Sequence, residues 1–350
     1  MAILLAACLT AFLISFLIIP LIIKYSLAKN LGDAPGRRKV HKKVTPSLGG
    51  VAIFLSFLAS SLIWLDFNLW SEIRYVLASL SLVFLLGVRD DLVPLRALHK
   101  LYGQLVVVII LLFSSVQLNS FYGLFGIYEI NPVLTYLLTG FTIIIITNSF
   151  NLIDGLDGLA GSVGTMSLVS FGIWFFMADS IVFSLFCFAM AGGIIAFLVF
   201  NWEPSEIFMG DTGAMVIGML LAICVIHFMS VNEALPSTHP VKFAATISAG
   251  ICFIIIPLFD TLRIIILRIS KGQSPFKPDK NHIHHAIMRL GMTHAKTATI
   301  LTSISALYIL GAIILRGIED KIMLSGILVL SVLLSIILDR LILRKLTIKS

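Results

Sequence analysis

Apolar residues run along almost the whole chain in blocks of membrane-crossing length. A helix needs about 20 predominantly apolar residues to cross the hydrocarbon core of a bilayer, and blocks near that length recur from one end of the sequence to the other. The pattern predicts about eleven membrane-spanning helices, at residues 2–23, 48–65, 75–88, 101–118, 132–147, 162–177, 181–200, 214–229, 241–269, 297–315 and 322–338. No stretch is long and polar enough for a separate soluble domain. We therefore expect an all-α, polytopic membrane protein in which residues 1–350 form a single transmembrane domain.

The basic residues predict how these helices are oriented. An odd number of spans places the two termini on opposite sides, and Lys and Arg in short loops favour the cytoplasmic side. With the N-terminus outside and the C-terminus cytoplasmic, 21 of the 25 Lys and Arg residues fall in cytoplasmic segments. The first apolar block has no basic residue before Lys24, unlike the charged start of a cleavable signal peptide. We count it as a helix of a multi-pass protein of the inner membrane.

Composition and charge agree with a membrane protein. Hydrophobic residues make up 59% of the chain and charged residues 12%, against roughly 45–50% and about 25% in soluble domains. The net charge of +7 comes from basic residues beside the spans, which favours contact with anionic lipid headgroups over nucleic acid binding. The four cysteines stand singly in apolar segments, without metal-ligand or disulfide spacing.

Two adjacent carboxylates, Asp90 and Asp91, end the third predicted span. Neighbouring carboxylates repel each other and are costly near hydrocarbon, so they need a cation, a basic partner or water. For an isolated pair, a solvated helix end paired with Arg89 or Arg96 would be the favoured interpretation. Further polar clusters on the same predicted side of the membrane make a functional role more attractive.

The second cluster follows the fifth span, where Asn148, Asn151, Asp154 and Asp157 recur every three residues. In a helix this spacing would place them along one face. Glycines lie between them and would let the backbone approach a ligand closely. An Asx-rich turn with glycine caps explains the glycines but not the regular polar spacing.

The third cluster centres on Asp211, which lies between Gly210 and Gly213 where the eighth span begins. An Asp in such a sequence is usually a helix N-cap. The free N–H groups of the same helix end would also receive a phosphate.

The last cluster contains His282, His284 and His285 beside Lys277 and Lys280, in the largest predicted cytoplasmic loop. Cysteine is absent nearby, so phosphate binding is favoured over a zinc site, although the spacing also allows zinc. All four clusters lie on one side of the membrane, and their oxygen ligands favour Mg²⁺ or Mn²⁺. Together they indicate phosphoryl chemistry at the cytoplasmic membrane surface.

The clusters occur in an order that resembles the polyprenyl-phosphate N-acetylhexosamine-1-phosphate transferases. The shared motifs are Asp90-Asp91 and residues 151–160, 208–213 and 282–285, with the basic first loop at 38–50. The resemblance runs from about Lys29 to Leu290. It implies transfer of a sugar 1-phosphate from a UDP-sugar to undecaprenyl phosphate with release of UMP, as the first membrane step of a cell-surface polysaccharide pathway.

The resemblance also implies roles for individual residues. The implied catalytic residues are Asp90, Asp91, Asp154, His282, His284 and His285, and the implied metal ligands are Asn151, Asp211 and Asp91. The implied substrate-binding residues are Lys39, His41, Lys42, Asp157, Asn201 and Phe208, the last by stacking on uridine. Asp90 would act either as a base or by orienting the acceptor, with Mg²⁺, or alternatively Mn²⁺, as the cofactor.

The histidine motif bears on the choice of sugar. This chain reads His-Ile-His-His, the form carried by the branch that uses UDP-N-acetylglucosamine, whereas the branch that uses UDP-N-acetylmuramoyl-pentapeptide carries three consecutive histidines. We therefore expect UDP-N-acetylglucosamine, with another UDP-N-acetylhexosamine or the pentapeptide donor as alternatives. A homodimer stays open.

Two alternative hypotheses assign the chain to another functional class, as a secondary transporter or as a lipid-binding scaffold. Transport sites lie near the membrane midplane in discontinuous helices, whereas Asp90, Asp154 and Asp211 lie at predicted helix ends. The nearest intramembrane candidate is Asp260 in the ninth span, for which the i,i+3 spacing predicts an ion pair with Arg263. Pro257 is expected to bend that helix. A scaffold would not need so many convergent carboxylates.

Overall fold

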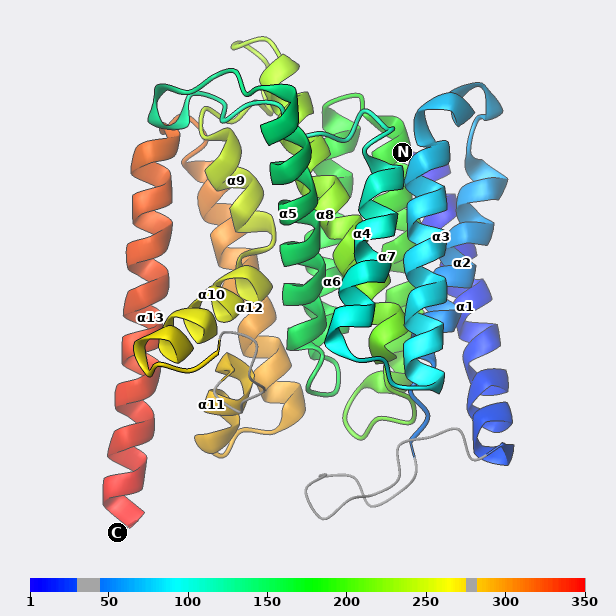
Figure 1. The fold of residues 1–350 in the computed structure, drawn as a ribbon. Helices are drawn as coiled ribbons and strands as arrows, with labels where there is room; N and C mark the ends of the chain where they lie inside the picture. The colour runs from blue at the N-terminus through cyan, green and yellow to red at the C-terminus, as the bar shows by residue number, and fades with distance from the viewer. Residues whose placement is uncertain (30–44, 275–281, 350) are drawn as a thin grey trace.

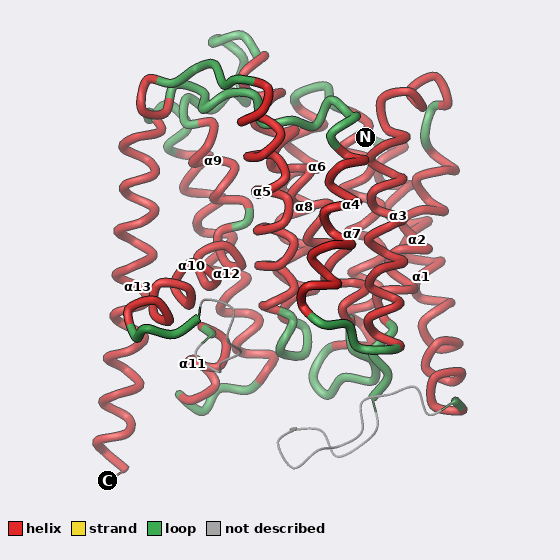
Figure 2. Tube along the Cα trace, viewed as in Figure 1, coloured by secondary structure: helices red, strands yellow, loops and turns green. Residues whose placement is uncertain are grey.

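The computed structural model describes residues 1–29, 45–274 and 282–349. Every regular element in these ranges is a helix, which confirms the predicted all-α class (Figure 2). The α-helices are α1 Ala2–Ala28, α2 Gly49–Trp64, α3 Trp70–Leu92, α4 Ala97–Leu111, α5 Pro132–Ile153, α6 Leu159–Met177, α7 Ile181–Asn201, α8 Gly210–Ala234, α9 Thr246–Phe253, α10 Ile255–Ser270, α11 Ile283–Arg289, α12 His294–Ile314 and α13 Asp320–Lys349. Two short 3₁₀ turns, η1 Phe67–Leu69 and η2 Leu124–Gly126, lie between them.

The long helices stand side by side as one bundle, with the chain termini at opposite ends (Figure 1). Seven described helices, α1, α5, α6, α7, α8, α12 and α13, are long and apolar enough to cross a membrane, and the bent pair α9 and α10 would be an eighth crossing. The remaining predicted spans correspond to α3 and to the shorter α2 and α4, of 16 and 15 residues. The protein is thus a multi-pass helical membrane protein.

Helix α8 lies at the centre of the bundle. Most of its length is buried, whereas most of α13 and α1 faces outward. Ring contacts join neighbouring helices in this core, because Phe171 of α6 packs against Phe228 of α8 and Phe253 of α9. Helix α8 is therefore held from several sides.

The ninth predicted span is broken, in contrast to the single bent helix expected over 241–269. Helices α9 and α10 meet at 93°, and Ile254 between them has a φ of −128°. Pro257 has no N–H to donate to the carbonyl of Phe253, and its ring would clash with that carbonyl. The freed carbonyl instead accepts a hydrogen bond from Ser167 Oγ, at 2.6 Å.

The predicted ion pair between Asp260 and Arg263 is wrong. Arg263 donates to Ser335 Oγ at 2.8 Å and to Asp339 Oδ1 at 3.2 Å, both on α13. Because α10 turns sideways toward α13 (Figure 1), Arg263 meets a neighbour that a straight helix would not bring to it. Asp260 is left to pair elsewhere, with the histidine segment described below.

Candidate active site

A lysine joins two of the acidic clusters. The Nζ atom of Lys100, at the start of α4, forms an ion pair with Asp90 Oδ2 and lies 3.1 Å from Asp211 Oδ2. Asp90 is almost fully buried and also accepts a hydrogen bond from the backbone N–H of Leu95, at 2.6 Å. The ammonium thus offsets part of the repulsion between carboxylates that lie far apart in the sequence. Sequence reasoning counted Lys100 only as one of several basic residues beside the membrane.

Asp91 holds the start of α8. Its Oδ1 accepts from the backbone N–H of Asp211 at 2.7 Å, and its Oδ2 accepts from the N–H and hydroxyl of Thr212 at 3.0 and 2.5 Å. The first N–H groups of a helix have no partner within the helix and carry partial positive charge. Asp91 satisfies two of them and thereby orients Asp211. Its predicted role as a metal ligand stays a prediction.

Asp211 is not the N-cap that its neighbours suggested, because it is the second residue of α8 and the N-cap is Met209. Gly210 before it has a φ of +73°, and a Cβ there would lie 2.1 Å from the carbonyl oxygen of Ser47 and 2.6 Å from Asp91 Oδ2. Only glycine fits such a backbone and such crowding. The turn therefore brings Asp211 beside Asp91 and the end of the first loop.

Asn151 completes this group. It lies in the last turn of α5, and its Nδ2 donates to Asp211 Oδ1 at 2.7 Å. Asn148, one turn earlier, donates instead to Gln104 Oε1 at 2.9 Å. Helix α5 ends at Ile153, so the predicted single polar face over 148–157 is wrong beyond that point.

Asp154 and Asp157 lie in the turn between α5 and α6. Asp154 is the C-cap of α5, and Gly158, with a φ of +74°, is the N-cap of α6. Asp157 is buried and its Oδ2 lies 3.2 Å from His294 Nδ1. His294, at the start of α12, is a second site neighbour that sequence reasoning did not single out.

Asn201 and Phe208 lie on either side of the loop between α7 and α8, and Asn201 contacts the α5–α6 turn. Asn201 Oδ1 accepts from the N–H of Gly158 at 2.9 Å, and its Nδ2 donates to the carbonyl of Ile207 at 2.8 Å. Phe208 joins the loop to the start of α2, since its carbonyl accepts from the N–H of Gly49 at 2.9 Å. The oxygen and the nitrogen of the Asn201 amide thus both hold this loop in place. Contacts of Asn201 and Phe208 with uridine stay a prediction.

The histidine motif lies at α11 and meets the α5–α6 turn. A Cβ placed at Gly155 would lie 2.8 Å from His284 Nε2, so this ring packs directly against the turn. The ring centroids of His282 and His284 are 5.6 Å apart, and those of His284 and His285 are 4.3 Å apart. Burial, with a smaller contribution from His285, lowers the pKa of His284 to about 3. His284 is therefore a neutral hydrogen-bonding group within the cluster for which the sequence predicts phosphate binding.

The site carries more negative than positive charge among the described residues. Asp90, Asp91, Asp154, Asp157 and Asp211 gather at one end of the bundle, with Lys100 between two of them. Burial, followed by the charges of Asp211, Asp91 and Asp157, raises the pKa of Asp154 to about 7. The predicted phosphate-binding residues Lys39, His41 and Lys42 lie outside the described residues.

The donor set suits a hard divalent cation. Carboxylate and amide oxygens are the ligands that Mg²⁺ prefers, and surplus negative charge is what a bound cation would relieve. No three His, Cys, Asp or Glu side chains in the described part of the chain are already grouped closely enough to hold a metal ion. Asp211 and Asn151 are nevertheless in contact and Lys100 links Asp211 to Asp90, which fits a cation that arrives with its substrate.

These features define a polytopic helical membrane protein with a carboxylate-lined site at one end of its bundle. The family model for glycosyl transferase family 4 matches residues 73–229, a range that contains all the described site residues except those at α11 and α12. The chain belongs to this family.

Three curated relatives match most of the chain. An undecaprenyl-phosphate alpha-N-acetylglucosaminyl 1-phosphate transferase from Yersinia pestis is 30% identical over 81% of this chain and 76% of its own length. The protein of that name from Escherichia coli K12 is 29% identical over 80% and 76%. A probable undecaprenyl-phosphate N-acetylglucosaminyl 1-phosphate transferase from Bacillus subtilis is 29% identical over 88% and 83%.

Proposed function

We propose that this protein transfers N-acetylglucosamine 1-phosphate from UDP-N-acetylglucosamine to undecaprenyl phosphate and releases UMP. The names of the relatives support this reaction. The observation that carries it is the position of Lys100 between Asp90 and Asp211, where three helix ends meet. A cation flanked by carboxylates at a membrane face suits chemistry between an anionic lipid and an anionic nucleotide.

In the proposed reaction, an oxygen of the acceptor phosphate attacks the phosphorus that bears the sugar. The bond from this phosphorus to the oxygen shared with the uridine-linked phosphate breaks, so that oxygen leaves with UMP. Such transfer depends mainly on positioning and on neutralising charge. Lys100 would hold a phosphate oxygen, and Asp90 would orient the acceptor through the ammonium that it contacts. An acceptor phosphate that is already ionised needs no base.

Asp211 and Asn151, with Asp91 behind them, are the residues that would hold Mg²⁺, or alternatively Mn²⁺. When bound there, the cation would supply countercharge to the donor diphosphate. The neutral ring of His284 would donate a hydrogen bond to a phosphate oxygen, and Asp154 would change the charge of the cluster when it gains or loses its proton. Asp157, Asn201 and Phe208 are proposed to border the uridine.

We place the protein in the inner membrane with this site on the cytoplasmic face. The distribution of Lys and Arg supports that orientation. The break between α9 and α10 is a feature shared with transporters, but the carboxylates discussed above gather at helix ends away from it.

The test is an assay with purified protein, undecaprenyl phosphate, Mg²⁺ and UDP-N-acetylglucosamine, followed by release of UMP. We expect UMP with this donor and much less with UDP-N-acetylmuramoyl-pentapeptide. Asp211→Asn should lower kcat about 100-fold or more, because it removes a carboxylate that would hold the cation by which charge in the transition state is stabilised. Asp339→Asn, an equal change on α13, should leave kcat intact.

The absence of UMP with every UDP-sugar tried would contradict the proposal. UMP release by Asp211→Asn at the original rate would remove Asp211 from the site while leaving the reaction in place.

A further inference from the structure

We propose that Asp260 is a positioning residue for the reaction, which fixes the ring of His282 and the start of α11. Its part in turnover rests on the proposed function, whereas its effect on the ring can be measured without substrate. Neither the resemblance nor the relatives' names assign Asp260 a role, and its sequence position suggested a structural ion pair.

Asp260 makes two contacts with the histidine segment. Its Oδ2 lies 2.9 Å from His282 Nδ1, and its Oδ1 accepts from the backbone N–H of Ile283 at 2.9 Å. The carboxylate is 1% exposed, so water does not compete for it. An ionised carboxylate only accepts hydrogen bonds. In this proposal the carboxylate accepts from Nδ1 of His282, which carries the ring hydrogen, and Nε2 is the atom left to contact a ligand.

The break in the ninth span brings Asp260 to this position. Asp260 lies seven residues after Phe253, so a straight continuation of α9 would carry it about 10 Å further along the same axis. The 93° turn sends α10 sideways toward α13 instead. Because Pro257 enforces the turn, the broken helix places the Asp260 carboxylate where it can hold α11.

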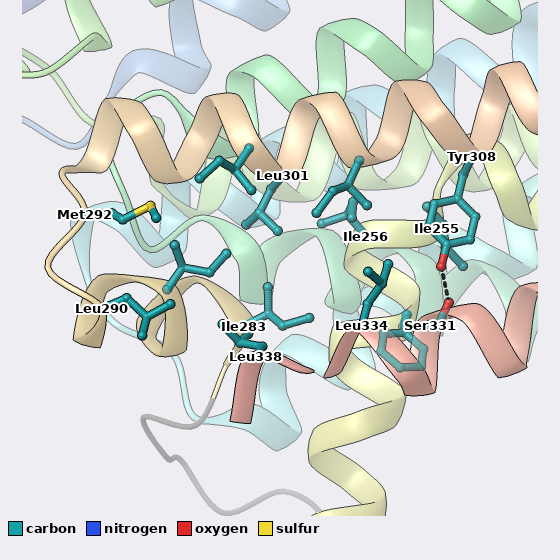
Figure 3. A pocket seen from close by; sticks show the side chains of 14 residues that line it. Ile255, Ile256, Ile283, Leu290, Met292, Leu301, Tyr308, Ser331, Leu334 and Leu338 are labelled. Carbon is teal, nitrogen blue, oxygen red and sulfur yellow. Dashed lines mark hydrogen bonds between the residues drawn. The ribbon is translucent and has the colours of Figure 1, made fainter. Parts of the chain in front are cut away.

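The other side of α11 makes mainly apolar contacts, apart from the hydrogen bond that Lys345 Nζ of α13 donates to the carbonyl of Leu290, just after the helix. Ile283 and Ile287 of α11, together with Leu290, line an apolar cavity of about 180 Å³ shared with α10, α12 and α13 (Figure 3). The two hydroxyls at this cavity, of Tyr308 and Ser331, bond to each other at 2.7 Å. Apolar contacts around a cavity do not set the rotation of a seven-residue helix, whereas a carboxylate bonded to its first N–H group does.

The position of the His282 ring affects the neighbouring groups of the site. Its ring lies nearly parallel to that of His284, with an interplanar angle of 10°, and His284 packs against Gly155 in the turn that carries Asp154. A change in the His282 ring would therefore move the groups that line one side of the proposed phosphate site.

The decisive variant is Asp260→Asn, which keeps size and shape. The amide offers one acceptor and one donor, so it cannot accept from both His282 Nδ1 and the N–H of Ile283. We expect kcat for UMP release to fall at least about tenfold, as for other outer partners of functional histidines. Asp339→Asn is the matched control, since it changes the carboxylate that holds the same helix through Arg263 and should keep kcat.

Nitrogen-15 NMR of histidine-labelled full-length protein provides the structural readout. His282 is assigned with His282→Gln. We expect the wild-type ring to carry its hydrogen on Nδ1, and Asp260→Asn to shift it toward Nε2 while Asp339→Asn does not. In a His282→Gln background, Asp260→Asn should cause no further loss of residual activity, because Asp260 acts through that ring.

Unchanged ring shifts in Asp260→Asn, or an equal loss of activity with and without His282, would overturn the proposal. If the wild-type protein releases no UMP, the proposed function fails, and the ring shifts still decide whether Asp260 fixes His282.

Discussion

At the scale of single residues, charge balance determines what the site can accept. Lys100 offsets Asp90 and Asp211, yet Asp154 still has its pKa raised to about 7 by burial and by neighbouring carboxylates. A free carboxyl titrates near pH 3.9, so the folded protein binds this proton more tightly than the unfolded chain does. The stability that Asp154 contributes is thus complete below about pH 4 and is lost as the pH rises through 7.

This pH dependence predicts a stabilising substitution at a functional position. Without divalent cations, Asp154→Asn should raise the thermal unfolding midpoint at pH 8 and raise it much less at pH 5, because the amide removes a charge that is unfavourable in the folded protein only when it is ionised. Unfolding of detergent-solubilised protein in EDTA at the two pH values measures this. An equal effect at both would show that the carboxyl has an ordinary pKa.

At the scale of elements, close backbone contact decides where α8 begins. A Cβ at Gly50 of α2 would lie 2.0 Å from the N atom of Gly213, and one at Gly87 of α3 would lie 2.4 Å from the Cα of Thr212. Small residues let membrane helices approach in this way. Asp91 then reaches the N–H groups of α8, so helix packing and capping together place Asp211.

Gly50→Ala should therefore be among the most damaging small substitutions in the chain. The added methyl meets backbone atoms, which cannot rotate away, so we expect a loss of about 1–3 kcal/mol or more and reduced UMP release. Thermal unfolding and the UMP assay measure the two effects.

Gly311→Ala, in α12, is the matched control because a Cβ there meets nothing within 4 Å. It should be neutral or slightly stabilising, since alanine favours a helix over glycine. A wild-type midpoint for Gly50→Ala would mean that α2 and α8 are not in close contact.

At the scale of the whole molecule, the bundle separates two ends with different chemistry. The carboxylates, Lys100 and the histidines gather at the end where the C-terminus lies, and the N-terminus is at the other end (Figure 1). The loop between α8 and α9 also lies away from the site. A lipid acceptor and a nucleotide donor would therefore meet on one face only.

This arrangement predicts which loops react from outside the cell. In spheroplasts, a membrane-impermeant maleimide should label Ser237→Cys, in the exposed loop after α8, and should label Glu206→Cys, in the loop before α8, only after lysis. The unsubstituted protein is the control for the native cysteines, of which Cys8 is half-buried and the others are buried. Labelling of Glu206→Cys in intact spheroplasts, and of Ser237→Cys only after lysis, would place the site on the outer face of the membrane.

Sequence by itself determined the class of protein, the approximate spans and the segments that carry chemistry. Hydropathy over about 20 residues reflects the cost of leaving backbone and side chains in hydrocarbon, so the apolar blocks located all the helices that cross the bundle. The motif residues did meet at one end of the bundle, because Asp90 and Asn151 lie where α3 and α5 end and Asp211 lies where α8 begins.

Only the tertiary structure decided which groups pair. Lys100 looked like one basic residue among many, Asp211 like an N-cap and Asp260 like the partner of Arg263. Asp211 instead meets residues of three helices distant in the sequence, brought near by glycine contacts. Lys100 pairs with Asp90 on the preceding helix. The turn at Pro257 directs Asp260 to His282 at the start of the next helix. Hydropathy and spacing are local properties, whereas an ion pair or a helix cap depends on how several helices pack together, and that packing set the geometry of the site.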